Sequence, residues 1–357
     1  MPLALSSAAR PAREAAGAVR NRAIAVWLFC ICGMLLVMIS LGGATRLTGS
    51  GLSIMEWAPL MGALPPLSDA EWHRLYALYQ QIPQYELINR GFGLDGFKSI
   101  FWLEWTHRLW GRLTGLVFLV PLLWFTLRGM ISARLGLRLF LLFILGGLQG
   151  AVGWFMVASG FAEGSTAVSA YRLVMHLVLA LALYAAILWT ALELWRPRPA
   201  AGTPRLAALL GVVCALVALT ILAGGFVAGL KAGLTYNTFP LMDGRLIPEG
   251  YGQLQPFVRN LTENIAAVQF DHRVLATVAA LVTLGTVAYG LWRAPGRAAR
   301  VPLAVLGGLV LLQYALGVTT LLLVVPVSLG TLHQAVAMLL LTAALVSLYL
   351  HRGRSHA

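Results

Sequence analysis

The feature that most constrains this chain is a series of apolar segments, each long enough to cross a lipid bilayer. A helix of about 20 apolar residues spans the hydrocarbon core, and a backbone in lipid has to satisfy its hydrogen bonds internally, as a helix does. Eight segments have this length and composition: 24–46, 104–127, 136–158, 168–193, 206–229, 266–292, 301–325 and 330–350. The sequence therefore predicts an all-α polytopic membrane protein with eight transmembrane helices.

Charged residues are sparse and unevenly placed. Of the 357 residues, 59% are hydrophobic and 11% are charged, which excludes a soluble domain. The net charge of +13 lies in short loops between apolar segments, so no nucleic-acid partner is expected. One side of the bilayer carries fifteen of the 26 basic residues: Arg10, Arg13, Arg20, Arg22, Arg128, Arg134, Arg138, Arg196, Arg198, Arg205, Arg293, Arg297, Arg300, Arg352 and Arg354. Because Lys and Arg are enriched in cytoplasmic loops, both termini are predicted to be cytoplasmic.

The sequence also contains an internal repeat. "LEWTHRL" (103–109) resembles "VQFDHRV" (268–274), and "LQGAVG" (148–153) resembles "LQYALG" (312–317). Each half has four helices, so both halves enter the bilayer from the same side, and two parallel-repeat four-helix bundles are predicted. The expected divisions are a cytoplasmic basic tail (1–23), an N-terminal half (24–193) with a long outer loop (47–103), a cytoplasmic linker (194–205), a C-terminal half (206–350) and a cytoplasmic tail (351–357).

The long outer loop contains one predicted helix, "LSDAEWHRLYALY". Ser68 and Glu71 have the spacing of a capping box, in which each side chain caps the first helical turn. The apolar face of this helix is expected to lie on the membrane surface as a lid, or to pack on top of the bundle.

Four histidines lie inside predicted membrane helices: His107, His176, His272 and His333. The repeat aligns His107 with His272 and His176 with His333. A single membrane histidine is often a hydrogen-bonded core residue, but buried ionisable groups in lipid are costly and commonly functional. Two imidazoles facing each other across a bundle can bind a haem iron axially. We therefore predict one haem per half, whereas a zinc site lacks further ligands and a proton-relay transporter does not require such regular pairing.

Three arginines are candidate ligands for haem propionates. Arg108 and Arg273 each follow a histidine directly, and Arg172 precedes His176 by one helical turn. Guanidinium groups suit carboxylates because they bind them bidentately. The alternative is that these side chains only extend to the membrane interface.

One acidic residue breaks the repeat. Glu104 stands one turn before His107, where the second half has Gln269. This spacing puts the carboxylate on the same helix face as the imidazole. A haem that only carries electrons does not need such an acid, whereas a site that handles protons or developing positive charge does. The alternative is a structural salt bridge from Glu104 to Arg108.

These residues together resemble the haem A synthase family. The resemblance covers roughly residues 24–350 and depends on "GGATRLTGSGLS" after the first span, "EWTH" on the second, "TYNTFPLMDG" in an outer loop and "FDHR" on the sixth. It implies that the substrate is haem O, whose C8 methyl group is oxidised to a formyl group by successive oxygenation, giving haem A for cytochrome c oxidase. It further implies that His107 and His176 hold the substrate, that His272 and His333 hold a haem b cofactor, and that Glu104 is the catalytic glutamate.

The resemblance also implies a location and partners. A multi-pass protein of the bacterial inner membrane is expected, in preference to the mitochondrial inner membrane. Cys30, Cys32 and Cys214 all lie in predicted spans, so the chain is similar to the cysteine-less subgroup of alphaproteobacterial and mitochondrial members. The farnesyltransferase that makes haem O and an unidentified electron donor are candidate partners, and the small-residue faces permit a homo-oligomer.

One mechanistic question and two rival functions stay open. In the first mechanism one histidine leaves the substrate iron so that oxygen binds there. In the second, both histidines stay bound, electrons leave the haem, and water attacks the methyl carbon. The main alternative function is a diheme b-type membrane electron-transfer protein without chemistry on its own haem. A transporter is the third hypothesis, although its polar residues would be expected near mid-membrane.

Overall fold

The computed structural model of the chain describes residues 5–59, 61–195, 203–293 and 296–352. Within these ranges eight helices are long and apolar enough to cross a membrane, which confirms the predicted number. They are α1 (Leu5–Leu47), α4 (Leu94–Leu127), α5 (Ala133–Ala158), α6 (Ala170–Trp195), α7 (Pro204–Gly229), α9 (Ile265–Arg293), α10 (Arg297–Leu322) and α11 (Val327–His351). Three short helices complete the described α-structure: α2 (Asp69–Tyr79), α3 (Pro83–Leu87) and α8 (Asn260–Glu263).

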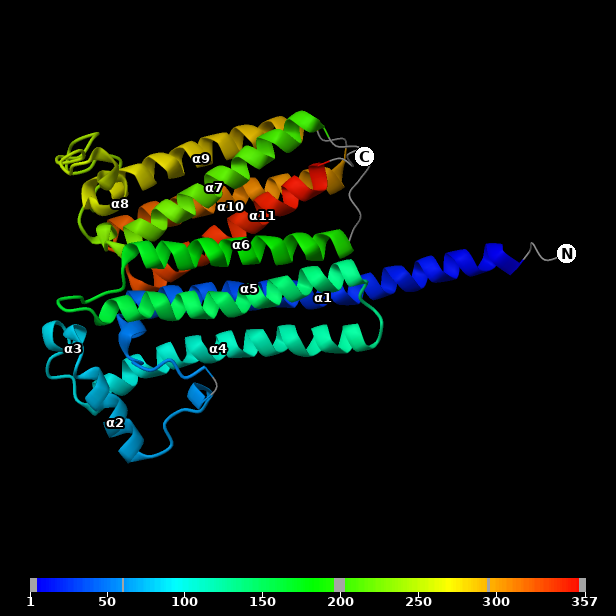
Figure 1. Cartoon of the computed structure of the whole chain (residues 1–357). Coiled ribbons are helices and arrows are strands. Elements are labelled where there is room, and N and C mark those ends of the chain that lie inside the picture. The colour runs from blue at the N-terminus through cyan, green and yellow to red at the C-terminus, as the bar shows by residue number, and fades with distance from the viewer. Residues whose placement is uncertain (1–4, 60, 196–202, 294–295, 353–357) are drawn as a thin grey trace.

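The long helices lie side by side in one bundle (Figure 1). We call α1, α4, α5 and α6 the first half, and α7, α9, α10 and α11 the second half. In the first half α1 packs on α4 and α6, and α5 packs on α4 and α6. In the second half α7 packs on α9 and α11, and α10 packs on α9 and α11. The halves meet where α1 contacts α11 and α6 contacts α7.

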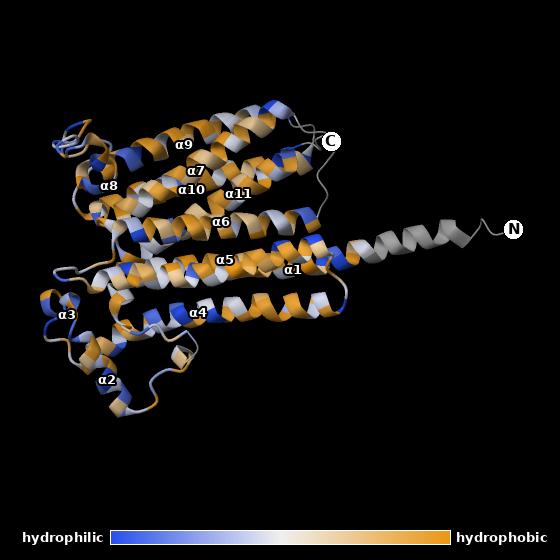
Figure 2. Ribbon diagram, viewed as in Figure 1, coloured by the Kyte–Doolittle hydropathy of each residue, from blue (hydrophilic) through white to orange (hydrophobic). Residues whose placement is uncertain are grey.

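The two ends of the bundle differ. One end, which we call the loop end, carries α2, α3 and α8, whereas α1 begins and α11 ends at the opposite end (Figure 1). Hydrophobic residues run along the helices, and hydrophilic residues gather at the helix ends and in α2, α3 and α8 (Figure 2). Many large apolar side chains are exposed on the bundle surface, for example Leu116, Leu141 and Leu281. Such a surface is stable in contact with lipid rather than water.

The core joins residues of both halves. Leu28 on α1, Ile187 on α6, Leu210 on α7 and Leu303 on α10 are almost completely buried in one cluster. A second, smaller cluster of buried residues lies at the loop end and contains Trp72.

Helix α4 begins ten residues before the predicted start of this span at residue 104. Its extra turns bury Phe97 and Phe101, and the ring of Trp72 on α2 lies 4.9 Å from that of Phe101. One half of the predicted capping box is confirmed, because the Ser68 hydroxyl accepts a hydrogen bond from the Glu71 backbone N–H. The Glu71 carboxylate instead accepts from Arg74. Thus α2 packs on the extended end of α4, and the predicted outer loop ends earlier than residue 103.

Helix α1 also begins earlier than predicted, at Leu5 instead of residue 24. The sequence "SSAAR PAREAAGAVR" is rich in alanine, which favours helix even where the residues are not apolar enough for lipid. Parts of five predicted divisions lie outside the described residues: positions 1–4 of the tail 1–23, 60 of the outer loop 47–103, 196–202 of the linker 194–205, 294–295 of the half 206–350 and 353–357 of the tail 351–357.

Candidate functional site

The four membrane histidines lie toward the loop end of α4, α6, α9 and α11. His176, His272 and His333 each stand about two turns from the start of their helix. His107 stands about four turns from the start of α4, because that helix extends beyond the bundle to reach α2. Each half therefore contributes two imidazoles, as the repeat predicts.

Each imidazole lies against a glycine of a neighbouring helix. A Cβ atom added to Gly153 on α5 would lie 2.9 Å from Cε1 of His176, and one added to Gly317 on α10 would lie 3.0 Å from Cε1 of His333. Any side chain at these two glycines would force the ring to move.

The same arrangement recurs on α1 and α7. A Cβ at Gly224 would lie 3.0 Å from Cε1 of His272, and one at Gly42 would lie 3.2 Å from Nε2 of His107. The absence of a side chain at each glycine thus provides the space that the imidazole occupies.

Two glutamines and one backbone carbonyl hold three of the imidazoles. The Gln149 amide nitrogen lies 3.3 Å from Nε2 of His176, and it also donates a hydrogen bond to the backbone carbonyl of His176 at 3.0 Å. The Gln313 amide nitrogen lies 3.2 Å from Nδ1 of His333. In the remaining case, Nδ1 of His272 lies 3.1 Å from the carbonyl oxygen of Thr220.

The residues present fit a haem with two axial imidazoles. His107 and His176 are close enough to interact electrostatically, and so are His272 and His333. Nδ1 of His107 and Nδ1 of His176 are buried without a hydrogen-bond partner among the described residues. No group of three or more His, Cys, Asp or Glu side chains at metal-binding distance occurs in the described ranges, which argues against a bare metal ion. Two imidazoles per site are the donor set of a six-coordinate haem.

Glu104 is 3% exposed and lies on α4 beside His107. Its Oε1 accepts a hydrogen bond from Nε of Arg108 at 2.6 Å, so the salt bridge considered from the sequence is present. Its Oε2 lies 3.9 Å from Nδ1 of His107, just beyond hydrogen-bond distance. One carboxylate oxygen is thus held by an arginine while the other faces the imidazole.

Gln269 occupies the matching place in the second half and is equally buried. Its Oε1 accepts from Arg273 at 2.9 Å, as Glu104 accepts from its arginine. Its Nε2, however, donates to the carbonyl oxygens of Ala232 and Tyr236 at 2.8 and 3.2 Å. The polar atom that corresponds to the free carboxylate oxygen is therefore bound to the loop after α7.

The arginines after these two residues hold the loops at the loop end. Arg108 donates to the carbonyls of Ile54 and Glu56, both at 2.9 Å. These contacts join α4 to the segment that follows α1. The predicted role of Arg108 in binding a propionate stays a prediction.

The second half repeats this tether. Arg273 donates to the carbonyls of Tyr236 and Thr238 at 2.7 and 2.8 Å. Arg172 has a different contact, because it donates to the carbonyl of Phe155 and lies over its ring. Propionate binding by Arg273 and Arg172 likewise stays a prediction.

The three cysteines lie on the membrane helices, as predicted. Cys30 and Cys32 are on α1 and Cys214 is on α7, and all three are free thiols. They lie in different surroundings, since Cys30 is exposed on the bundle surface and Cys32 is buried.

The sequence analysis did not assign a role to Gln149, Gln313, Thr220, Gly153 or Gly317. A signal for them exists. Gln149 and Gly153, Gln313 and Gly317, and Thr220 and Gly224 are all four residues apart, which places each pair on one helix face. The sequence does not reveal, however, that a histidine of a neighbouring helix packs against each of these faces; the tertiary structure does.

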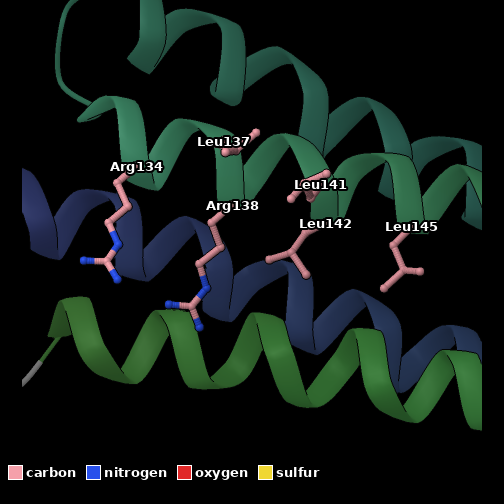
Figure 3. A pocket seen from close by; sticks show the side chains of 6 residues that line it. All are labelled: Arg134, Leu137, Arg138, Leu141, Leu142 and Leu145. Carbon is pink, nitrogen blue, oxygen red and sulfur yellow. The ribbon is translucent and has the colours of Figure 1, made fainter.

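A groove of about 440 Å³ lies elsewhere, along the first half of α5. Figure 3 shows its lining side chains, with Arg134 and Arg138 followed by a row of leucines. Arg138 is paired with Glu193 at 2.7 Å. The groove contains no histidine and ends at Leu145, before Gln149, so it is separate from the histidine sites.

Comparison with known proteins gives consistent matches along the chain. Residues 25–345 match the model of the family described as "Cytochrome oxidase assembly protein" (COX15-CtaA). The chain is 62% identical to a "Heme A synthase" of Granulibacter bethesdensis over 94% of this chain and 89% of that protein. It is 49% identical to a "Heme A synthase" of Rhodospirillum centenum over 98% and 93%, and 48% identical to one of Nitrosospira multiformis over 91% and 92%.

Proposed function

The chain belongs to the haem A synthase family, and from that premise we propose how its two halves share the conversion of haem O into haem A. It is a multi-pass membrane oxidoreductase of haem biosynthesis that makes haem A from haem O. The family description connects this product to the assembly of cytochrome oxidase. The division of labour between the halves, described below, is our proposal.

The two halves form a parallel repeat of two four-helix bundles. Three observations support this: the same order of helix contacts in each half, a histidine on the second and fourth helix of each, and the matching loop tethers of Arg108 and Arg273. The turns after α1 and α7 also match, because Gly49 and Lys231 both have left-handed backbone conformations at φ 69° and 54°. Basic residues at the end opposite the loop end favour cytoplasmic termini and a bacterial inner membrane location.

The first half binds the substrate haem O through His107 and His176. Its C8 methyl group is oxidised to a formyl group by successive oxygenation, so carbon–hydrogen bonds are replaced by bonds to an oxygen atom that comes from oxygen or water, and protons and electrons leave. Among the described residues, the one carboxylate oxygen within 4.0 Å of a ring nitrogen of these four histidines is Oε2 of Glu104. Its Oε2 can accept a proton from the reacting carbon or stabilise positive charge that develops there. Arg108 keeps the carboxylate in place through Oε1.

The second half binds haem b through His272 and His333. When bound, haem b supplies a redox centre that relays electrons. The protein orients the two ligands, since the Thr220 carbonyl fixes one imidazole and the Gln313 amide fixes the other. The Thr220 carbonyl accepts from Nδ1–H of His272, and a hydrogen bond of this kind fixes the orientation of a metal-binding histidine and raises its basicity. The Gln313 amide nitrogen can only donate, so it holds the ring of His333 in place without raising its basicity. Gln269 offers no proton acceptor facing His272, because its amide is bound to the loop.

Several finer features belong to the same proposal. Arg108, Arg172 and Arg273 lie near the loop end, and their unused guanidinium hydrogens are available to haem propionates. The three cysteines lie in helices, so a thiol relay in an outer loop has no residues in this chain, as in the cysteine-less subgroup. The electron donor, the farnesyltransferase that makes haem O, and a second copy of the chain are the partners to be tested.

The observation that carries the proposal is the free oxygen of Glu104 at 3.9 Å from His107, against the bound amide of Gln269. The test is to purify wild type and Glu104→Ala from cells that make haem O, extract the pigments, and identify them by chromatography and mass spectrometry. Haem b with haem O and haem A is expected in wild type, and haem b with haem O alone in the variant. Haem b alone in both samples would instead indicate a diheme electron carrier.

A further inference from the structure

The four imidazoles are not held equally. His176, His272 and His333 each have a hydrogen-bonding group from a neighbouring helix within 3.3 Å of a ring nitrogen. His107 has none among the described residues, and its nearest polar contact is Glu104 Oε2 at 3.9 Å. A ring without a fixed partner turns more freely than a ring that is hydrogen-bonded on one edge.

The ring of His107 is also turned differently. The atom closest to the ideal Cβ position of Gly42 is Nε2 at 3.2 Å, whereas the other three imidazoles present Cε1 to their glycines. The nitrogen that commonly binds iron thus faces α1 in His107.

We propose that His107 is the exchangeable axial ligand of the substrate haem and that His176 is the retained one. This inference rests on the proposed function of the first half as the substrate site. Gln149 contacts Nε2 of His176 and donates to its backbone carbonyl, so the residue is held in place, and only the Gln149 amide has to shift for Nε2 to meet the iron. His107 alternates between the iron and a resting position against Gly42.

When His107 leaves, a coordination position becomes open on the side of the substrate haem that faces Glu104. His107 and Glu104 lie on the same face of α4, so the position that His107 leaves is on the side that carries the carboxylate. A small reactant such as oxygen or water reaches the substrate there, next to a proton acceptor. The second half lacks this combination, because His272 is fixed by Thr220 and Gln269 is bound to the loop.

The first test compares His107→Ala with His176→Ala in the full-length protein, purified from cells that make haem O. The haem O plus haem A content per chain reports on the first half, and haem b content serves as an internal control for folding. We expect His107→Ala to keep its substrate haem within about threefold of wild type, as high-spin ferric haem by electron paramagnetic resonance. We expect His176→Ala to lose about tenfold or more. Equal losses, or the reverse order, would overturn the inference.

A second test does not remove a ligand. Carbon monoxide binds reduced haem only where an axial position opens, so wild type with substrate haem should bind it in the first half and not at haem b. Gly42→Ala crowds the resting position of His107 and should slow carbon monoxide binding, measured per bound substrate haem, about tenfold. The matched variant Gly153→Ala crowds His176 and should lower the content of substrate haem instead. Absence of carbon monoxide binding in wild type, or equal rates in wild type and Gly42→Ala, would contradict the proposal.

Failure of this inference differs from failure of the proposed function. Both tests measure haem content and ligand exchange without turnover, and conversion of haem O to haem A by wild type is measured in parallel. If wild type makes haem A while the two histidine variants lose haem equally, only the ligand assignment falls. If the asymmetry is found but no haem A forms, the proposed role of the first half falls.

Discussion

The two halves of the molecule share an arrangement of four helices with two histidines and an arginine tether, and they differ at the buried residue one turn before the first histidine. In each, a side chain one turn before the first histidine accepts a hydrogen bond from an arginine that tethers a loop. Gln269 has an amide with which to bind that loop, and Glu104 has a second oxygen that can only accept. The comparison teaches that exchanging one amide for one carboxylate leaves an oxygen without a hydrogen bond beside the first histidine, where the second half binds its loop.

The largest effect is expected from making the first half resemble the second. Glu104→Gln should lower the rate of haem A formation by about 10²-fold or more, because a positioned proton acceptor contributes at least that factor. Substrate haem should remain bound, since the histidines are unchanged. Haem O and haem A extracted from the same membranes measure both quantities. A variant with undiminished haem A formation would show that Glu104 serves only as the partner of Arg108.

The reciprocal variant is the control for this experiment. Gln269→Glu should not create haem A chemistry in the second half, because it removes the donors to the Ala232 and Tyr236 carbonyls. Its expected effect is a loss of about 1–3 kcal/mol of stability from the two carbonyls left unpaired.

A smaller effect is expected from breaking the arginine tethers. Arg108→Ala leaves the buried Glu104 carboxylate without its ion-pair partner, which should cost about 3–5 kcal/mol. Arg273→Ala leaves the neutral Gln269 and should cost about 1–3 kcal/mol. Thermal unfolding of the purified variants in one detergent measures the difference. Equal shifts in the unfolding temperature would mean that the Glu104 carboxylate is not charged in its buried site.

Gln149 and Gln313 should each affect the binding of only the haem in their own half. Gln313→Ala should weaken the binding of haem b about tenfold or more, because the imidazole of His333 loses its orienting group. Gln149→Ala should have the corresponding effect on substrate haem and leave haem b unchanged. Quantifying each haem separately after extraction provides the measurement. A parallel loss of both haems in either variant would indicate a general packing defect.

The smallest effect is expected in the loop between α1 and α4, which carries α2. Arg74 on α2 binds Glu56 and Glu71 at the exposed surface, and these hydrogen bonds lower the pKa of both carboxyl groups. Arg74→Ala should therefore cost less than about 1 kcal/mol at neutral pH. A carboxyl group with a lowered folded-state pKa stabilises above its unfolded pKa, about 4.3 for Glu. The difference from wild type should vanish as the pH falls below that value, or in high salt. A difference that persists in acid or salt would show that packing of the Arg74 stem is responsible.

Much of this architecture follows from local sequence. The eight membrane helices were predictable because the bilayer sets the length of each apolar segment. The residues at which the helices begin were less predictable, since α4 starts at Leu94 and packs Phe97 and Phe101 on α2. The histidine pairs and the contrast between Glu104 and Gln269 followed from the repeat, and the salt bridge to Arg108 followed from helical spacing.

What the sequence by itself determined is therefore the number of membrane helices, the membership of a family and the identity of the polar residues within the apolar spans. Only the tertiary structure decided which of those residues meet. Thr220 reaches His272 across 52 positions of the chain, and Arg108 reaches Ile54 across 54. The physical reason is that hydropathy fixes which segments enter lipid, whereas the rotation and depth of each helix follow from packing against its neighbours. That rotation places Nε2 of His107 against Gly42 and leaves one oxygen of Glu104 free beside it.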